Sequence, residues 1–395
     1  MAKPPRPSLD EALAIIHDRL APLGTQPVPV ADAFGRVTAA PLRARQDVPR
    51  FPVSAMDGYA LHSGETAAAS EAQPVTLALG GPVYAGHAPS PLEPGGALPI
   101  ATGAPIPAGA DAVLIREQAE IADGRLIVRA PVASHRNVRQ TGEDMAAGGD
   151  VLPAGAVLMP HSLGALAACG VAEVEVRRRP RIGLISTGSE LGGIGDPIGG
   201  AGLIDSNAPM IAACAQAFGL PCNFLGTAAD QAAAIDRLFD SASDCDILLS
   251  TGGVSAGDLD LVRGRLEARG AAIHFHGVRM RPGKPILFAC LADGRPYFGL
   301  PGNPVAALTG FRFFVVPALR RLLGLPPEKG EPVGCKAPPR PDCTLILRGR
   351  RITPSEVDCD LDQRSHVLSS TLAADCWVKL RENGEAEAFP LVARP

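Results

Sequence analysis

The chain has 395 residues, of which 46% are hydrophobic and 20% charged, as is typical of a globular protein of roughly two to four domains. Its net charge of −4 argues against a general attraction to nucleic acid or to a membrane surface. Nine cysteines without a Cys-x-x-Cys pair favour free thiols in a reducing cytoplasm over a disulfide framework or a zinc site.

The first residues have no apolar core, so we expect no signal peptide. Ser8 and Glu11 have the spacing of a capping box, which predicts a helix from residue 9 onwards. Leu13 and Ile16 would lie on its apolar face. A short strand and a second helix, over residues 31–35, are expected next.

Residues 47–60 form a long irregular segment with two prolines and an Asp57-Gly58 pair. Loops of this length without regular structure tend to be functional, although an Asp-Gly turn alone would also explain Asp57. Short alternating strands between Gly and Pro turns follow up to residue 132. They predict a small barrel-like or sandwich insertion.

The segment Arg136–Asp144 brings two arginines beside two carboxylates. Either it is a solvated ion-pair loop, or it adds an anion-binding and metal-binding edge to a cleft. Residues 151–172 carry no charged side chain, but their prolines and glycines favour a buried strand, turn and helix over a membrane span.

Three apolar runs, over residues 181–185, 246–250 and 296–300, are followed by Gly-rich turns and helical patterns. This order predicts a parallel α/β sheet, in which ligands bind beyond the carboxyl ends of the strands. Helices are expected over 205–218, 231–239, 258–269 and 303–323, the last with an interior proline.

The glycines of these turns leave backbone N–H groups free to hold an anion, which predicts a phosphorylated ligand. Three carboxylates follow strand-end turns and would hold Mg²⁺, namely Glu190, Asp230 and Asp260. Asp230 has the alternative role of capping the helix after it. Arg281 and Lys284 flank a Pro-Gly pair and would point at one anion.

Neither common nucleotide-binding loop is present. Pro285 stands where a Walker A loop needs Ser or Thr, and residues 252–257 do not match a dinucleotide fingerprint. A Pro-rich linker and three strand patterns after residue 326 predict a small C-terminal β domain. The expected units are residues 1–46 with 136–177, then 47–135, 178–326 and 327–395.

Taken together, the motifs resemble those of the molybdopterin molybdenumtransferases (MoeA and the E domain of gephyrin) over nearly the whole chain. The segments that carry the resemblance are 54–60, 142–144, 186–191, 205–207, 252–260, 281–285 and 300–304. The Gly-Gly-Val-Ser motif alone is shared with pterin adenylyltransferases and other nucleotide enzymes.

The resemblance implies a multidomain α/β plus β protein with a MogA-like pterin-binding domain. It also implies an elongated cytoplasmic homodimer that inserts molybdate into adenylylated molybdopterin and releases AMP in a Mg²⁺-dependent reaction. A molybdopterin adenylyltransferase is the expected partner protein. No binding to nucleic acid or to a membrane is expected.

The resemblance also implies residue roles. Asp57 and Asp144 would face the site from the partner subunit, and Glu190 and Lys284 would complete the catalytic set. Arg281, Lys284, Arg348 and Ser365 would form the molybdate pocket. The other expected substrate-binding residues are Ser186, Thr187, Gly188, Asp205, Ser206, Asn207, Gly252, Gly253, Ser255, Gly257, Pro285, Pro301 and Asn303.

The chain departs from the family pattern at four places. Ser189 stands where the family usually has Asp, Gly277 where a second Lys is frequent, and Ala306 where Ser is frequent. Residues 362–366 replace a Gly-Gln-Gly-Ser type of turn. Two alternatives stay open: a molybdopterin adenylyltransferase, and a non-catalytic pterin-binding scaffold.

Overall fold

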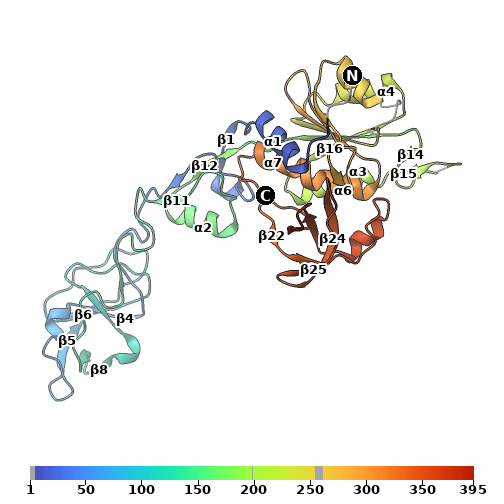
Figure 1. The fold of residues 1–395 in the computed structure, drawn as a ribbon. Coiled ribbons are helices and arrows are strands. Elements are labelled where there is room, and N and C mark those ends of the chain that lie inside the picture. The colour runs from blue at the N-terminus through green and yellow to red at the C-terminus, as the bar shows by residue number, and fades with distance from the viewer. Residues whose placement is uncertain (1–4, 198, 254–260) are drawn as a thin grey trace.

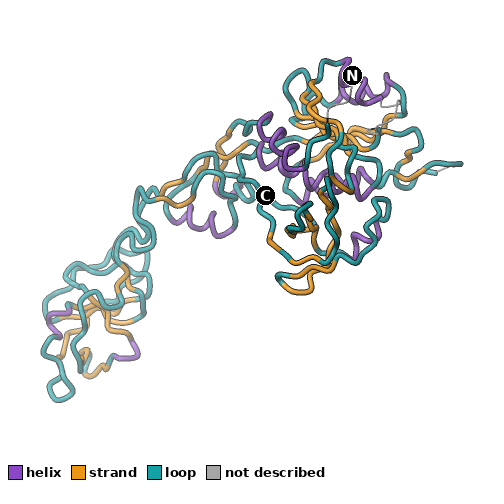
Figure 2. Tube along the Cα trace, viewed as in Figure 1, coloured by secondary structure: helices purple, strands orange, loops and turns teal. Residues whose placement is uncertain are grey.

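The computed structural model describes residues 5–197, 199–253 and 261–395. The molecule is elongated, with a large lobe, a narrow neck and a small distal lobe (Figure 1). The distal lobe consists of strands, loops and short helical turns, whereas the longer helices lie in the large lobe and the neck (Figure 2). No helix in the described ranges is both long enough and apolar enough to cross a membrane.

The distal lobe is built on a six-stranded sheet in the order β7-β4-β6-β5-β9-β8. Its strands are β4 (Gly58–Leu61), β5 (Val75–Leu79), β6 (Gly96–Ile100), β7 (Ala112–Ile115), β8 (Glu120–Ala122) and β9 (Arg125–Val128), with 3₁₀ turns at Ser63–Thr66 and Arg116–Gln118. Along β7, Ala112 and Leu114 enter one apolar cluster and Val113 enters another. Both faces of the sheet are therefore covered, as strand periodicity requires.

The neck holds three antiparallel strand pairs and one helix. The pairs are β1 (Thr25–Pro29) with β12 (Glu173–Arg177), β2 (Leu42–Arg43) with β11 (Asp150–Leu152), and β3 (Val53–Ser54) with β10 (Val138–Arg139), and the helix is α2 (Pro160–Ala168). The helix predicted over residues 31–35 is wrong: a single 3₁₀ turn, Val30–Asp32, is found there.

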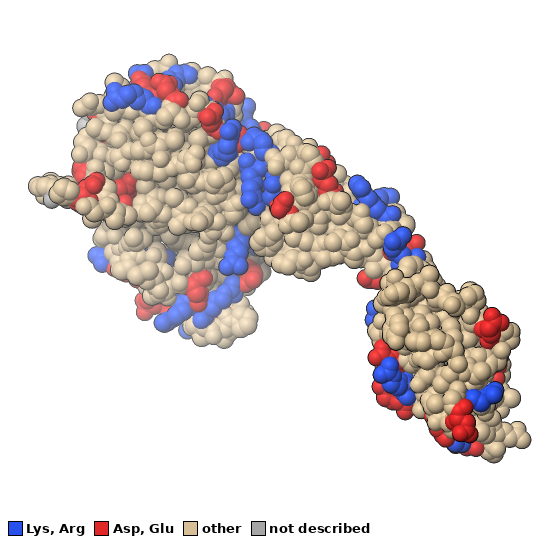
Figure 3. All heavy atoms as spheres, turned by 180° about the vertical axis from the view of Figure 1, so that it is seen from behind, with Lys and Arg blue, Asp and Glu red and all other residues tan. Residues whose placement is uncertain are grey.

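Basic residues form a band where the neck meets the large lobe, on the face shown in Figure 3. The chain crosses this junction between the end of β12 at Arg177 and the start of β13 at Ile182. Asp246 accepts hydrogen bonds of 2.7 Å from both terminal nitrogens of Arg178. This pair joins the crossing segment to the residue just before strand β17.

The large lobe contains a six-stranded sheet in the order β16-β13-β17-β21-β20-β18. Its strands are β13 (Ile182–Thr187), β16 (Cys222–Ala228), β17 (Ile247–Thr251), β18 (Ala272–His276), β20 (Leu287–Cys290) and β21 (Pro296–Leu300). The first four strands of that order are parallel, whereas β20 and β18 are antiparallel to their neighbours. The sheet is mixed rather than wholly parallel, because β20 and β21 are joined by a short turn without a crossover helix.

In the sequence, each helix of this lobe comes after one or more of its strands, except α1, which precedes them all. The helices are α1 (Leu9–Arg19), α3 (Asn207–Ala217), α4 (Ala232–Ser241), α5 (Leu261–Ala268), α6 (Pro304–Gly310) and α7 (Val316–Leu322), with a short parallel pair of β14 (Leu191–Gly192) and β15 (Leu203–Ile204). The capping box of α1 is confirmed: Glu11 N donates to Ser8 Oγ at 3.2 Å, and Ser8 N donates to the Glu11 carboxylate at 2.6 Å. A π turn, Phe311–Val315, joins α6 to α7 just before Pro317, which has no N–H to continue the α-helical ladder.

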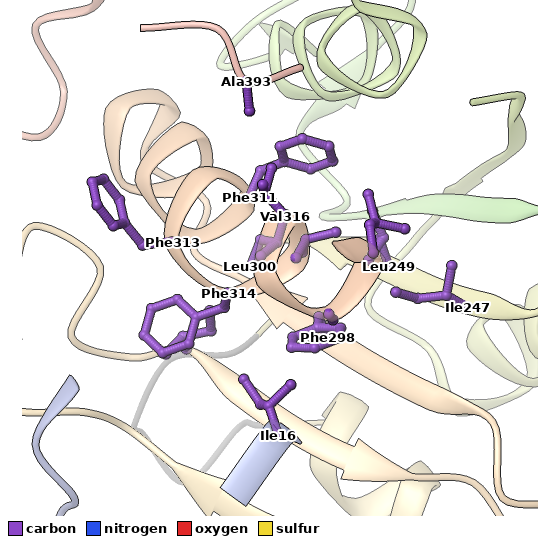
Figure 4. Close-up of a cluster of buried hydrophobic side chains, with 14 of the residues drawn as sticks. Ile16, Ile247, Leu249, Phe298, Leu300, Phe311, Phe313, Phe314, Val316 and Ala393 are labelled. Atoms are coloured by element: carbon purple, nitrogen blue, oxygen red, sulfur yellow. The ribbon is translucent and has the colours of Figure 1, made fainter. Parts of the chain in front are cut away.

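The main apolar core lies between the α6–α7 segment and the central sheet (Figure 4). Phe298 and Leu300 of β21 meet Phe311, Phe314 and Val316 there, with Ile16 of α1 on the edge. Burial of each such side chain contributes about 1.5–3 kcal/mol. This core therefore fixes the start of α6, where the predicted site segment 300–304 ends.

The C-terminal sheet has the order β22-β27-β26-β24-β25-β23. Its strands are β22 (Glu331–Pro332), β23 (Gly334–Cys335), β24 (Thr344–Thr353), β25 (Glu356–Asp358), β26 (Cys376–Leu380) and β27 (Ala386–Pro390), with a 3₁₀ segment at Leu368–Ala373. Strand β19 (Met280–Arg281), which follows β18 of the central sheet, pairs in parallel with β24. The C-terminal sheet is thus hydrogen-bonded directly to the segment that carries Arg281.

Candidate functional site

A hydroxyl network connects the carboxyl ends of β13 and β17. The buried Ser186 hydroxyl donates to Asp205 Oδ2 at 2.5 Å and lies 3.1 Å from Thr251 Oγ1. Asp205 Oδ1 accepts the N–H groups of Asn207 and Ala208, each at 3.0 Å. Asp205 therefore caps α3 and fixes its start, and any direct contact with a ligand stays a prediction.

The strand-end turns approach one another so closely that glycine is required. A Cβ added at Gly252, where φ is +81°, would lie 2.4 Å from the Thr187 carbonyl oxygen. A Cβ at Gly188, where φ is +149°, would lie 2.7 Å from Glu190 Oε1. The Glu190 carboxylate therefore folds over the backbone of Gly188, in space that another residue would occupy.

The loop after β21 lies beside the other two. A Cβ at Gly302 would come within 3.7 Å of the Gly252 Cα, and Asn207 Nδ2 donates to the Gly302 carbonyl at 2.8 Å. Asn207 Oδ1 is buried and accepts no hydrogen bond from the described residues. The three predicted strand-end segments therefore meet at one edge of the central sheet.

The C-terminal region reaches the same edge through Ser365. Asn303 Nδ2 donates to Ser365 Oγ at 3.1 Å, and Val305 N donates to the Ser365 carbonyl at 3.2 Å. Asn303 precedes the first turn of α6, whose N–H groups point away from the helix toward this contact. The predicted residues Asn303 and Ser365 are thus brought together.

Arg348 supports the loop that carries Ser365. Its guanidinium is fully buried and donates through Nη2 to the carbonyls of Asp362 and, at 3.4 Å, Arg364. Nε and Nη1 are buried and have no partner among the described residues. Burial lowers the pKa of Arg348, and the charge of Asp362 partly opposes this. The Arg348 side chain therefore has a structural role, and its Nε and Nη1 have no partner among the described residues.

The turn 281–285 lies against the first turn of α6. A Cβ at Gly283 would stand 3.8 Å from the Ala306 carbonyl oxygen. Arg281 and Lys284 are exposed, and neither forms an ion pair within the described ranges. Burial raises the pKa of the Cys343 thiol, and the positive charges of Arg281 and Lys284 oppose this rise. The turn that carries these two cations therefore packs against the first turn of α6, the helix that follows Asn303.

The predicted carboxylates are only partly brought together. Ser189 N donates to Asp230 Oδ2 at 3.2 Å, and Asp230 N donates to Ser189 Oγ at 2.9 Å, so Asp230 lies beside the turn that carries Glu190. The described residues include no cluster of three His, Cys, Asp or Glu suited to a metal ion. The third predicted carboxylate, Asp260, lies outside the described residues, as do Ser255 and Gly257.

Asp57 and Asp144 lie away from this edge of the sheet. Asp57 precedes β4 of the distal lobe, which Figure 1 shows at the far end of the molecule. The Thr102 N–H (2.7 Å) and hydroxyl (2.9 Å) donate to Asp57 Oδ1 and lower the pKa of its carboxyl. Asp144 is exposed near β11 of the neck. Their action from a partner subunit stays a prediction.

Three positioning residues were not among the predicted site residues. Thr251 contacts Ser186, the Gly302 carbonyl accepts from Asn207, and Gln363 holds both the N–H and the carbonyl of Arg348 at 2.9 Å. Thr251 is adjacent in sequence to the predicted Gly252, and Gly302 to the predicted Asn303. This adjacency could have identified both residues from the sequence. Gln363 lies two residues before the predicted Ser365, but its bonds to Arg348 depend on how β24 meets this loop.

Comparisons with known proteins agree with this arrangement. Residues 7–170 match the model of the MoeA N-terminal region (domain I and II), and residues 183–321 match that of a probable molybdopterin binding domain. Molybdopterin molybdenumtransferase 2 of Mycobacterium tuberculosis is 36% identical over 81% of this chain and 80% of its own length. Molybdopterin molybdenumtransferase of Nostoc sp. is 36% identical over 84% of this chain and 78% of its own length.

The fold is also that of solved relatives. Two crystal structures of the molybdopterin biosynthesis MoeA protein from Pyrococcus horikoshii match with TM-scores of 0.84 and 0.83 and identities of 29% and 28%. They cover 98% of this chain and 100% and 98% of theirs. The chain therefore belongs to the molybdopterin molybdenumtransferase family, whose members are transferases.

Proposed function

We propose that the chain inserts molybdate into adenylylated molybdopterin, with Mg²⁺-dependent release of AMP, to give molybdenum cofactor. Family membership supports a role in molybdenum cofactor biosynthesis. The observation that carries the proposal for this chain is the Asn303–Ser365 contact. It joins a predicted oxyanion residue of the C-terminal region to the strand-end loops of the predicted pterin-binding domain.

Molybdate is a doubly charged tetrahedral oxyanion, which charged N–H donors and a hydroxyl suit. Arg281 and Lys284 supply two cations without an ion-pair partner among the described residues, Arg348 supplies two nitrogens, Nε and Nη1, without a partner there, and Ser365 supplies a hydroxyl. We assign these residues to the molybdate pocket. The neighbouring loops after β13, β17 and β21 take the pterin phosphate and the adenylate through backbone N–H groups.

The residues also fit a magnesium ion. Mg²⁺ is commonly bound by one or two protein carboxylates together with substrate phosphate oxygens. Glu190 and Asp230 belong to adjoining turns that are hydrogen-bonded through Ser189. We assign the ion to these carboxylates, with Asp260 as the third, and when bound it neutralises charge on the phosphate linkage to AMP.

The chain's own groups position the reactants. Glu190 is held over Gly188, Asp205 fixes the start of α3, and Arg281 with Lys284 orients molybdate. The two dithiolene sulfurs of the pterin then replace one molybdate oxygen: a Mo–O bond breaks, two Mo–S bonds form, and the oxygen leaves as water with the two thiol protons. The proposed site also includes Asp57 and Asp144 of a second copy, so we propose a homodimer. Each subunit has the four units 1–46 with 136–177, 47–135, 178–326 and 327–395. An adenylyltransferase is the proposed upstream partner.

The test is incubation of the purified protein with adenylylated molybdopterin, Mg²⁺ and molybdate, followed by assays of AMP and active cofactor. We expect AMP and cofactor to appear together and to need both molybdate and Mg²⁺. Attachment of AMP to molybdopterin would instead identify an adenylyltransferase. Binding without turnover would identify a scaffold.

A further inference from the structure

Two of the nine cysteines face each other in the C-terminal sheet. Cys335 ends β23, which pairs in parallel with β25, and Cys359 follows the last residue of β25. Their sulfur atoms are 3.3 Å apart, and both side chains are partly exposed. All nine cysteines lie in the described ranges, and all are free thiols. The proposed function uses neither Cys335 nor Cys359.

The two thiols differ in their surroundings. Either sulfur could donate to the other, but the Ala337 backbone N–H also points at Cys335. Hydrogen bonds from Cys359 and then from Ala337 outweigh burial and lower the pKa of Cys335 to about 6. The contact with Cys335 and burial raise the pKa of Cys359. The shared hydrogen bond therefore favours loss of one proton from the pair, and the Ala337 contact favours Cys335 as the sulfur that loses it.

In three of the other thiols the pKa is raised rather than lowered. Burial raises the pKa of Cys214 and Cys222 to about 11 and that of Cys376 to about 12. Cys376 is a near neighbour of the pair but is buried. Thiolates rather than thiols react with oxidants. Cys335 therefore differs from the buried cysteines in two ways, because its pKa is lowered and its side chain is partly exposed to solvent.

We propose that Cys335 and Cys359 are a redox pair that hydrogen peroxide converts to a reversible disulfide. Bond formation needs the sulfurs to approach from 3.3 Å to about 2.05 Å, and Cys359 lies just beyond the last residue of β25. The Cys359 carbonyl accepts from Gln363 Nε2 at 3.1 Å. The disulfide therefore forms at the start of the segment that carries Gln363 and Ser365.

The reaction has two steps. The Cys335 thiolate attacks one peroxide oxygen, the O–O bond breaks, and uptake of a proton gives a sulfenic acid and water. Cys359 then attacks the Cys335 sulfur, the S–O bond breaks, and a second water leaves with the thiol proton. Two electrons pass from the thiols to peroxide, and a dithiol reductant reverses the change.

The first experiment treats the full chain with a small excess of hydrogen peroxide and maps the product by mass spectrometry without reduction. We expect a loss of about 2 Da, reversed by a dithiol, in one peptide pair that contains Cys335 and Cys359. Oxidation spread over several cysteines, or a Cys359–Cys376 bond, would overturn the proposal.

The second experiment separates the two roles. In Cys359→Ser, whose hydroxyl still donates to Cys335, peroxide should leave a sulfenic acid on Cys335 that dimedone traps. In Cys335→Ser, the rate of thiol loss with peroxide should fall about tenfold, because the sulfur that attacks peroxide has been removed. Cys222→Ser is the control and should behave as wild type. Trapping at Cys359 in Cys335→Ser, or an unchanged rate, would contradict the assignment.

Discussion

Asn303 and Ser365 are joined by a 3.1 Å hydrogen bond across a sequence separation of 62 residues. Asn303 belongs to the loop after the central strand β21, and Ser365 to the loop supported by Arg348 of the C-terminal sheet. The turn 281–285, which carries Arg281 and Lys284, packs through Gly283 against the start of α6, the helix that follows Asn303.

Ser365→Ala should weaken the use of molybdate more than it weakens folding. The substitution removes one hydroxyl that both contacts Asn303 and belongs to the proposed oxyanion pocket. We expect the KM for molybdate to rise about tenfold, which corresponds to about 1.4 kcal/mol, with little change in thermal stability. Steady-state kinetics measures the effect. Ser355→Ala, at an exposed position of the same sheet, is the control and should change neither quantity.

Asp205→Asn should destabilise the fold, because Asp205 accepts three hydrogen bonds in a buried position. An amide presents its NH₂ group to one set of these donors and leaves that set without an acceptor. The expected loss is about 1–3 kcal/mol of unfolding free energy, measured by denaturant titration. Asp196→Asn, in an exposed turn with one backbone hydrogen bond, should lie within about 0.5 kcal/mol of wild type. Equal stability of both variants would contradict the capping role of Asp205.

Gly188→Ala should disturb Glu190 specifically. The added Cβ would lie 2.7 Å from Glu190 Oε1, and φ at this position is +149°. We expect the Mg²⁺ concentration for half-maximal activity to rise several-fold, because the carboxylate must move. Gly164→Ala in α2 adds the same methyl group with nothing within 4 Å, and should leave Mg²⁺ dependence unchanged. A wild-type magnesium profile for Gly188→Ala would remove the support for Glu190 as a ligand.

The Arg178–Asp246 pair should make stability depend on pH. Burial would raise the pKa of Asp246, but the hydrogen bonds from Arg178 and the Arg181 backbone outweigh it, so the pKa is lowered. The resulting stabilisation is present above the ordinary Asp pKa of about 3.9 and is lost as pH falls through the lower, folded-state pKa. Asp246→Asn should therefore be less stable than wild type at pH 7, and the difference should shrink toward pH 3. A difference that is the same at both pH values would contradict this linkage.

Much of the sheet edge could be predicted from the sequence, because short apolar runs and Gly-rich turns are local signals. The run 296–300 became β21 with the same bounds, and Ser8 with Glu11 formed the expected capping box. The antiparallel direction of β20 and β18 was not predictable from the runs themselves, since period and composition do not encode strand direction.

The contacts between distant segments could not be read from local pattern. Ser365 was identified by resemblance alone, and its bond to Asn303 depends on how the C-terminal sheet docks. The same is true of Arg348, whose burial and carbonyl contacts depend on the loop 362–365, and of Cys335 beside Cys359. Such pairings are set by tertiary packing rather than by propensity.

The most direct measurement of the central claim is molybdate binding by isothermal titration calorimetry to wild type, Lys284→Met and the control Lys329→Met. Lys284 has no ion-pair partner within the described ranges and belongs to the turn that packs against the start of α6, whereas Lys329 is exposed elsewhere. We predict that Lys284→Met binds molybdate at least about tenfold more weakly and that Lys329→Met matches wild type. Equal affinity in all three proteins would contradict the account, because molybdate would then bind elsewhere or not depend on this site.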